Sequence, residues 1–295
     1  SQMVKTSLET QSFDITKDFN NEKGDLNNID GIDCPRCNNK GYILIDDDNG
    51  VTQTFVPCEC MKKRKSLRIS KESGLGELLK HRVKDFIADA DWQKRAKALV
   101  IDYIQNATDE WLCILGQSGA GKTHLCSAVC NYRIDQQREV RYISWNDFTK
   151  QYKDSFKNGS YKTVIKELQE VDILYIDDLF KGSTSEYDVK NICYDIINYR
   201  YNNKKTTIIS SEYDFSELNE IDNAIAGRIK QMCKKYLMIV RRTDENNYRL
   251  KGEWKWAIIK SVQFLDTKKK ETQQQVPQDN FYDKNFVLED DDIGF

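Results

Sequence analysis

The sequence predicts an α/β fold in which a parallel sheet is flanked by helices. From residue 111 onward, short apolar runs alternate with amphipathic stretches, as in strand-helix units around a parallel sheet. A glycine-rich loop at residues 116–123 joins the first run to a helical stretch, and a later run ends in two aspartates. Strands are expected at residues 111–115, 140–144, 172–176, 206–210 and 236–240, with helices between them.

Length and composition bound the domain count and the compartment. The chain has 295 residues, of which 39% are hydrophobic, enough for one sizeable core, a small module and tails. No window approaches about 18 consecutive apolar residues, and the N-terminus is polar where a secretory signal would be apolar. We therefore expect a cytoplasmic protein with no membrane partner. The net charge is only −2, so any nucleic-acid surface must be local.

The cysteines predict a metal site near the N-terminus. Four of the nine are clustered as a CxxC pair and a CxC pair: Cys34, Cys37, Cys58 and Cys60. A hairpin across residues 46–50 would bring the pairs together as a tetrahedral thiolate site, for which Zn²⁺ is the expected ion. An iron–sulfur cluster and free thiols are the alternatives. The other five cysteines are scattered among apolar residues and are expected to fill the core.

The glycine-rich loop has the spacing of a phosphate-binding P-loop, which predicts a P-loop ATPase. Its residues are Gly116, Gln117, Ser118, Gly119, Ala120, Gly121, Lys122 and Thr123. The glycines let backbone N–H groups turn toward the phosphates of ATP, and the following helix adds its positive end. Lys122 is expected to neutralise the β- and γ-phosphates, and the Thr123 hydroxyl to bind Mg²⁺. His124 comes next, where packing near the loop is favoured over catalysis.

A second part of the nucleotide site is expected after the strand at residues 172–176. Asp177 would hold the water shell of the Mg²⁺, and Asp178 would orient or deprotonate the attacking water. A pair of helix-capping aspartates is the alternative. The next strand ends in Ser210 and Ser211, one of which could sense the γ-phosphate, and a simple turn explains them nearly as well.

Five segments together resemble the AAA+ ATPases of the DnaC/DnaI type, which load the bacterial replicative helicase. They are residues 116–125 (GQSGAGKTHL), 173–179 (ILYIDDL), 207–212 (TIISSE), 225–229 (IAGRI) and 247–250 (NYRL). The cysteine-rich segment likewise resembles the zinc-binding region of such loaders. The resemblance implies an AAA+ fold, an arginine finger at Arg228, a sensor at Ser210 or Ser211, and ATP-dependent oligomers. Glu212 departs from the family, in which many members have Asn.

The same resemblance implies two partners, a replicative DNA helicase and single-stranded DNA. Because the P-loop is also similar to the transposition-helper ATPases of the IstB type, three hypotheses stay open. The first is an ATPase that delivers or opens the helicase on single-stranded DNA. The others are a transposition helper and a weakly hydrolysing, nucleotide-gated adaptor.

Two basic segments are candidates for DNA contact. Residues 62–68 are strongly basic, and phosphate contact and a solvated helix face are equally good interpretations. At residues 150–166, lysines are interleaved with aromatic side chains, in the interval where the family places its helices that bind single-stranded DNA. Aromatics that pack the domain are the alternative.

The sequence divides into five segments. We expect a polar leader at residues 1–30, a Cys₄ module at 31–62, a helical linker at 63–106, the ATPase domain at 107–255 and a flexible acidic tail at 256–295. The tail ends in an acidic run followed by Ile293, Gly294 and Phe295, similar to the tip of bacterial single-stranded-DNA-binding proteins. A replication protein that binds such tips is a candidate partner, whereas a solvated or autoinhibitory acidic end is the alternative.

Overall fold

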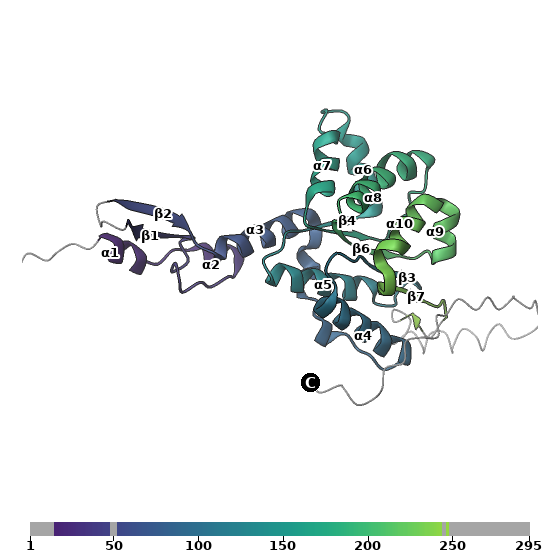
Figure 1. Cartoon of the computed structure of the whole chain (residues 1–295), viewed down its shortest axis with the longest axis horizontal. Coiled ribbons are helices and arrows are strands. Elements are labelled where there is room, and N and C mark those ends of the chain that lie inside the picture. Colours follow the sequence, from purple (N-terminus) through teal and green to yellow (C-terminus); the bar gives the residue numbers. More distant parts are fainter. Residues whose placement is uncertain (1–14, 48–51, 244–245, 248–295) are drawn as a thin grey trace, which may run out of the picture. The chain divides into compact units, whose positions relative to one another are not determined.

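The computed structural model describes residues 15–47, 52–243 and 246–247, all within the unit Ser1–Lys251. Its centre is a parallel sheet (Figure 1), in which the strand order is β4-β5-β6-β3-β7. The strands are β3 (Leu112–Gly116), β4 (Val140–Ser144), β5 (Ile173–Asp177), β6 (Thr206–Ser211) and β7 (Leu237–Val240). All the predicted strands are present, with ends that differ from the prediction by at most one residue. The predicted α/β fold is confirmed.

Both faces of the sheet are buried, which explains why its central strands are apolar throughout. Every residue of β3 and of β5 is buried. Alternate side chains of β3 belong to different core clusters: Cys113 and Leu115 to one, Leu112 and Ile114 to the other. A parallel sheet covered on both sides needs such continuous apolar runs.

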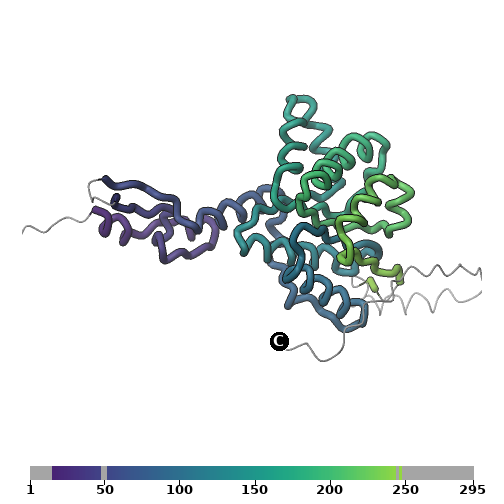
Figure 2. The backbone as a smooth tube through the Cα atoms, viewed as in Figure 1, coloured from purple at the N-terminus to yellow at the C-terminus, as the bar shows by residue number. Residues whose placement is uncertain are grey.

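Helices form the layers on the two sides of the sheet (Figure 2). One core cluster contains side chains of α4 (Asp91–Asn106) and α5 (Lys122–Asp135). The other is built from helices that follow β4: α6 (Trp145–Ser155), α7 (Tyr161–Glu170), α8 (Tyr194–Asn202), α9 (Phe215–Ile221) and α10 (Asn223–Cys233). A π-helical turn, Asp188–Cys193, leads into α8, and a 3₁₀ turn, Lys234–Tyr236, leads into β7.

A buried arginine fixes the starts of two strands that carry the predicted site. Arg200 lies in α8 and is fully buried. Its guanidinium donates hydrogen bonds to the carbonyl oxygens of Leu168, Gln169, Val171, Asp172 and Thr206. Because burial disfavours the charged form, the pKa of Arg200 is lowered to about 9. The carbonyls compensate the buried charge, and they tie the end of α7 to the starts of β5 and β6.

The N-terminal part contains a small antiparallel sheet. Strand β1 (Tyr42–Asp46) pairs with β2 (Gln53–Pro57), and residues 48–51 between them lie outside the described residues. Helix α1 (Ile15–Asn21) covers β1, because Asn20 exchanges two hydrogen bonds with the backbone of Leu44, each 2.9 Å long. Helices α1 and α2 (Leu26–Asp30) fall in the segment predicted as a polar leader.

The segment predicted as a helical linker contains two long helices and three short turns. Helix α3 (Cys60–Ser70) is followed by the turns Lys71–Leu75, Gly76–Lys80 and Val83–Asp85 and then by α4. Ser70 at the end of α3 donates a hydrogen bond of 2.9 Å to the carbonyl oxygen of Val140 in β4. This contact joins the linker to the edge strand of the parallel sheet.

Two predictions concern parts of the chain outside the described residues. These are the acidic tail with its Phe295 tip, and residues 248–250 of the last matching segment. Within the described ranges, no helix combines the length and the apolar character needed to cross a bilayer.

Candidate functional site

The predicted P-loop connects β3 to α5, and its glycines are required by the backbone. Gly116, Gly119 and Gly121 have φ angles of 98°, 74° and 80°, in the left-handed region that other residues avoid. A Cβ atom on Gly116 would lie 2.1 Å from the carbonyl oxygen of Val240, and one on Gly121 would lie 2.8 Å from the ring of Phe86. The loop borders a pocket whose lining residues are Ser118, Gly119, Gly121, Lys122, Thr123, Asp178 and Glu212.

Lys122 supplies the positive charge of this pocket. Its Nζ atom donates hydrogen bonds to the carbonyl oxygens of Gly116, at 2.9 Å, and Gln117, at 2.8 Å. Burial lowers the pKa of Lys122, and the nearby Asp178 and Glu212 carboxylates oppose that shift. A phosphate entering the loop can replace these neutral carbonyls with stronger, charge-assisted hydrogen bonds.

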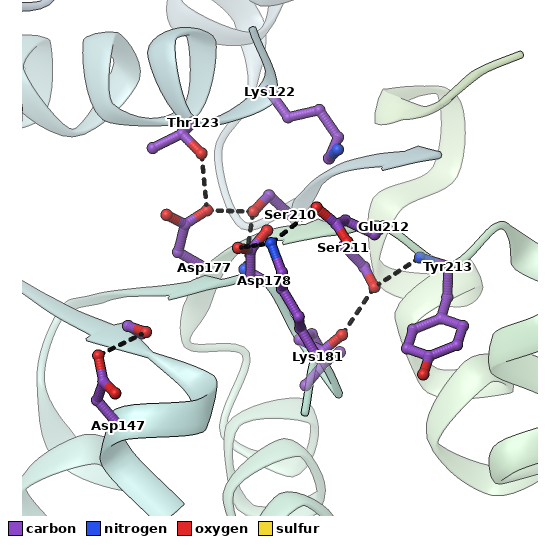
Figure 3. A network of polar contacts seen from close by, with 12 residues as sticks. Lys122, Thr123, Asp147, Asp177, Asp178, Lys181, Ser210, Ser211, Glu212 and Tyr213 are labelled. Carbon is purple, nitrogen blue, oxygen red and sulfur yellow. Dashed lines mark hydrogen bonds and ion pairs between the residues drawn. The ribbon is translucent and has the colours of Figure 1, made fainter. Parts of the chain in front are cut away.

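Asp177 lies at the end of β5, where four hydroxyl groups donate to its carboxylate. Oδ1 accepts from Thr123 at 3.2 Å, from Tyr175 at 2.6 Å and from Ser210, while Oδ2 accepts from Tyr142 at 3.3 Å. Figure 3 shows Thr123 and Ser210 pointing at Asp177 from different elements. The two predicted Mg²⁺ ligands, Thr123 and Asp177, are therefore neighbours. They form an oxygen donor set that suits this ion, which would neutralise phosphate charge when bound.

The two tyrosines of this network were missed by the sequence analysis. Tyr175 precedes Asp177 by two residues in the same strand, so both side chains leave one face of the sheet. The register of β4 on β5 then places Tyr142 opposite Tyr175. Burial, reinforced by the charge of Asp177, raises the pKa of both phenols, so they remain hydrogen-bond donors. The alternation was visible in the sequence, whereas the strand pairing was not.

Asp178 and the two candidate sensor serines differ in their contacts with the site. Asp178 has a φ of 53°, and its N–H donates to the Ser210 hydroxyl at 3.0 Å. Ser210 thus contacts both aspartates. The Ser211 hydroxyl is buried and donates to a backbone carbonyl at 2.8 Å. The pocket lining contains Glu212 rather than either serine.

His124 contacts the linker rather than the pocket. Its ring stacks on His81 with centroids 4.5 Å apart and meets Phe86 edge-on at 5.6 Å. Its Nε2 atom lies 3.0 Å from the carbonyl oxygen of Arg82. Burial, together with the neighbouring His124, lowers the pKa of His81. These contacts agree with the packing interpretation of His124.

Arg228 lies in α10, outside the pocket lining, and is held by aromatic rings. Its guanidinium lies 5.0 Å from the ring of Tyr194 and 5.6 Å from that of Tyr201. It donates hydrogen bonds to the Asn198 side chain at 3.2 Å and to the Ala224 carbonyl at 2.9 Å. The side chain is partly exposed, so a charge held by these rings is available to a neighbour.

The sulfur atoms of the predicted metal site converge. Those of Cys34, Cys37, Cys58 and Cys60 all lie within 4.8 Å of one another. The Cys34–Cys58 and Cys37–Cys60 separations are 3.8 and 3.7 Å. A zinc ion with Zn–S bonds of about 2.3 Å has tetrahedral S–S edges of roughly 3.8 Å, so the four residues fit zinc. The Gly41 N–H donates to the Cys37 sulfur at 3.3 Å, a contact that favours a thiolate.

The basic run at residues 62–68 is not a simple solvated helix face. Arg64 is buried and donates to both oxygens of Asp30, at 2.5 and 2.6 Å. Lys63 pairs with Asp135 at 3.0 Å. Part of the charge in this run is therefore used within the fold.

The second basic segment also has internal partners. Lys153 pairs at 2.8 Å with Asp188, which is buried. Phe156 and Tyr161 stack with ring centroids 4.4 Å apart, and Tyr152 is buried in the core. Both interpretations of this segment keep support, because Phe156 remains exposed while Tyr152 packs the domain.

A glycine loop between a strand and a helix, with carboxylates at the end of a second strand, defines a P-loop nucleotide-binding domain, and its five-stranded parallel sheet flanked by helices matches the AAA+ class. Comparison with known proteins agrees with that class. Residues 80–235 match the family described as the bacterial DnaA ATPase domain, and the chain belongs to this family.

Two relatives and one solved structure indicate how far the similarity extends. The chain is 33% identical over 213 residues to the uncharacterized protein YqaM of Bacillus subtilis (strain 168), covering 67% of each chain. It is 30% identical over 236 residues to the phage-like element PBSX protein XkdC of the same strain, covering 75% of this chain and 87% of XkdC. A crystal structure of the DnaC helicase loader is 22% identical, covers 57% of this chain and 99% of its own, and has a TM-score of 0.49.

Proposed function

We propose that this chain binds and hydrolyses ATP, forms ATP-dependent oligomers, and delivers or opens a replicative DNA helicase on single-stranded DNA. The observation that carries the ATPase part is a pocket lined by Lys122 and Thr123, with Asp177 accepting a hydrogen bond from Thr123 at 3.2 Å. The helicase and the single-stranded DNA come from the similarity of five segments to loaders of the DnaC/DnaI type. Membership of the bacterial DnaA ATPase family supports a role in replication.

In this proposal each site residue has a distinct task. The loop N–H groups and Lys122 hold the phosphates, and Thr123 and Asp177 hold the Mg²⁺ with its water shell. Asp178 orients the attacking water, and Ser210 positions both aspartates through its two hydrogen bonds. Arg228, preorganised by its aromatic neighbours, acts on ATP bound by the next subunit.

We further propose that the Cys₄ cluster holds a structural zinc ion. A closed set of four thiolates leaves no open coordination position for catalysis, so the ion would stabilise the small module. The module then presents a surface to the helicase or to DNA.

The test is steady-state ATP hydrolysis with and without single-stranded DNA and the helicase from the same source, followed by a helicase-loading assay. We expect both ligands to raise turnover and the helicase to unwind a substrate that it cannot enter alone. Filaments on duplex DNA with no helicase affinity would favour a transposition helper instead. Capture of the client from cells would identify it.

One observation favours a second candidate, an adaptor that binds ATP and turns over slowly. The Asp178 carboxylate is paired with Lys181 at 3.0 Å, so it is less available to an attacking water than a free carboxylate. Turnover that stays low with DNA and helicase present, while ATP controls client binding, would support this candidate.

A further inference from the structure

Two carboxylates line the phosphate pocket together with Lys122. Asp178 and Glu212 both belong to its lining, whereas Lys122 is the lining residue with a positive charge. Both carboxylates are partly buried, so their charges are screened less than on an open surface. Without compensation they would repel the γ-phosphate of ATP, which carries negative charge to the edge of the pocket.

Lys181 provides that compensation. Its Nζ atom lies 3.0 Å from Oδ2 of Asp178 and 2.7 Å from Oε1 of Glu212, so one ammonium joins both carboxylates (Figure 3). The hydrogen bond to Glu212 raises the pKa of Lys181, so the side chain stays charged. Burial raises the pKa of Glu212, but its contacts with Lys181 and Ser118 bring it below the usual value. The three groups form an ion-pair clamp, by which we mean Asp178, Lys181 and Glu212.

The backbone holds this clamp in a fixed turn. Asp178 and Phe180 have φ angles of 53° and 67°, both in the left-handed region that costs energy for non-glycine residues. The surrounding structure imposes them: the N–H of Leu179 donates to the carbonyl of Ser210 at 2.8 Å, and the N–H of Lys181 to that of Asp178 at 2.9 Å. Phe180 is fully buried. Backbone strain that is maintained at this turn indicates that the position of Lys181 has a function.

We propose that Lys181 is a positioning residue that sets the preference of this site for ATP over ADP. It neutralises Asp178 and Glu212, so the γ-phosphate can occupy the pocket beside them. ADP lacks that phosphate and depends mainly on the P-loop and Lys122. This inference rests on the proposed nucleotide site, and it adds a residue for which the P-loop motif has no position.

The experiment measures binding of MgATP, as a non-hydrolysable analogue, and of MgADP to the full chain. In Lys181→Met, which removes the charge but keeps the length, ATP affinity should fall by about ten- to hundredfold, since the uncompensated carboxylates would repel the γ-phosphate. ADP affinity should change by less than about threefold. Lys181→Arg should keep the preference for ATP.

The decisive experiment asks whether a substitution of Glu212 restores the ATP affinity lost in Lys181→Met. In the Lys181→Met background, Glu212→Gln removes the repelling charge and should restore most of the ATP affinity. Lys190→Met is the matched control, because Lys190 pairs with Glu186 on the exposed surface. That variant should bind both nucleotides as the wild type does.

The outcomes separate this inference from the proposed function. An equal loss of ATP and ADP affinity in Lys181→Met, or no rescue by Glu212→Gln, would show that Lys181 only stabilises the turn. An unchanged ratio of the two affinities would overturn the inference while the nucleotide site stands. A wild-type chain that binds neither nucleotide would overturn both.

Discussion

The nucleotide pocket and the cysteine cluster are held together by different kinds of structure. Behind the pocket lie β3 and β5, whose residues are all buried, and core clusters on both faces of the sheet. Among the described residues before α3, the buried apolar side chains are Cys37, Leu44 and Cys58. Two of these three are themselves predicted metal ligands. The nucleotide pocket is therefore supported by a large apolar core. In the N-terminal part, the cysteines of the cluster themselves make up most of the buried apolar side chains.

Because of this difference, the two sites are stabilised by different interactions. A two-stranded sheet with so little buried apolar surface is marginal by itself, so the proposed zinc ion would supply much of its folding free energy. The parallel sheet, in contrast, is stabilised by the apolar cores on both of its faces. That core fixes the strand ends that carry the pocket residues, and phosphoryl transfer depends on groups held in place in this way.

The largest expected effect is loss of the metal. Cys34→Ser or Cys58→Ser should release one equivalent of zinc and unfold the segment before α3, because structural zinc contributes about 10–16 kcal/mol in small domains. Nucleotide binding should survive, since the ATPase core has its own sheet. Metal analysis by mass spectrometry and hydrogen exchange of residues 15–59 measure the two effects.

A core cysteine gives the matched control for that prediction. Cys193 is buried against the parallel sheet and far along the chain, so Cys193→Ser should leave the metal content unchanged. Iron with a visible chromophore would contradict the zinc assignment. Amides of residues 15–59 that stay protected without metal would contradict the comparison itself.

The second effect concerns the pocket alone. Lys122→Ala removes the cation from a lining that also holds Asp178 and Glu212, so ATP hydrolysis should fall below detection. The melting temperature should change little, because α5 keeps its apolar contacts with the sheet. Hydrolysis and thermal unfolding are measured on the same preparation. Near-native turnover in this variant would place the phosphates elsewhere.

The same contrast explains what could be predicted from the sequence. The P-loop and the CxxC and CxC pairs are local patterns, and their residues converge in the structure as their spacing indicated. The strands were found from continuous apolar runs, because both faces of the sheet are buried. Arg64 differed from both expectations for its segment, since its partner Asp30 lies 34 residues earlier in the chain.

The contributions that sequence analysis missed all depend on strand order. Tyr142 reaches Asp177 because β4 pairs with β5, and Lys181 reaches Glu212 because β5 pairs with β6. Neither strand pairing can be predicted from the local sequence pattern around these residues. Glu212 is visible in the sequence as a departure from a family pattern, but its place in the pocket lining depends on the fold.

Arg228 gives the third effect, at the proposed contact with ATP bound by the next subunit. Arg228→Ala should leave nucleotide binding by the monomer unchanged and lower assembly-dependent hydrolysis by about a thousandfold, the contribution of arginine fingers in related reactions. Hydrolysis measured against protein concentration checks this. Arg138→Ala is a control, because Arg138 lies on the exposed surface and pairs with Asp172 of its own chain at 3.2 Å. If Arg228→Ala lowered nucleotide binding by the monomer as much as it lowers hydrolysis, Arg228 would instead be a structural residue that packs on Tyr194.

The smallest expected effect concerns the hydroxyl groups that donate hydrogen bonds to Asp177. It tests how much one of them contributes to hydrolysis. Tyr175→Phe removes one of the four hydroxyls on Asp177 and leaves the ring in place, so no cavity forms. The other three donors still orient the carboxylate, and we expect hydrolysis to fall by about tenfold, near the lower limit for the loss of one hydrogen bond to a charged group. The Mg²⁺ concentration for half-maximal activity should rise, because a less constrained Asp177 holds the water shell of the ion less well. Tyr132→Phe, at a partly exposed position on α5, should leave both quantities unchanged. A fall in hydrolysis with an unaltered Mg²⁺ dependence would mean that the Tyr175 hydroxyl supports the strand rather than the metal-binding carboxylate.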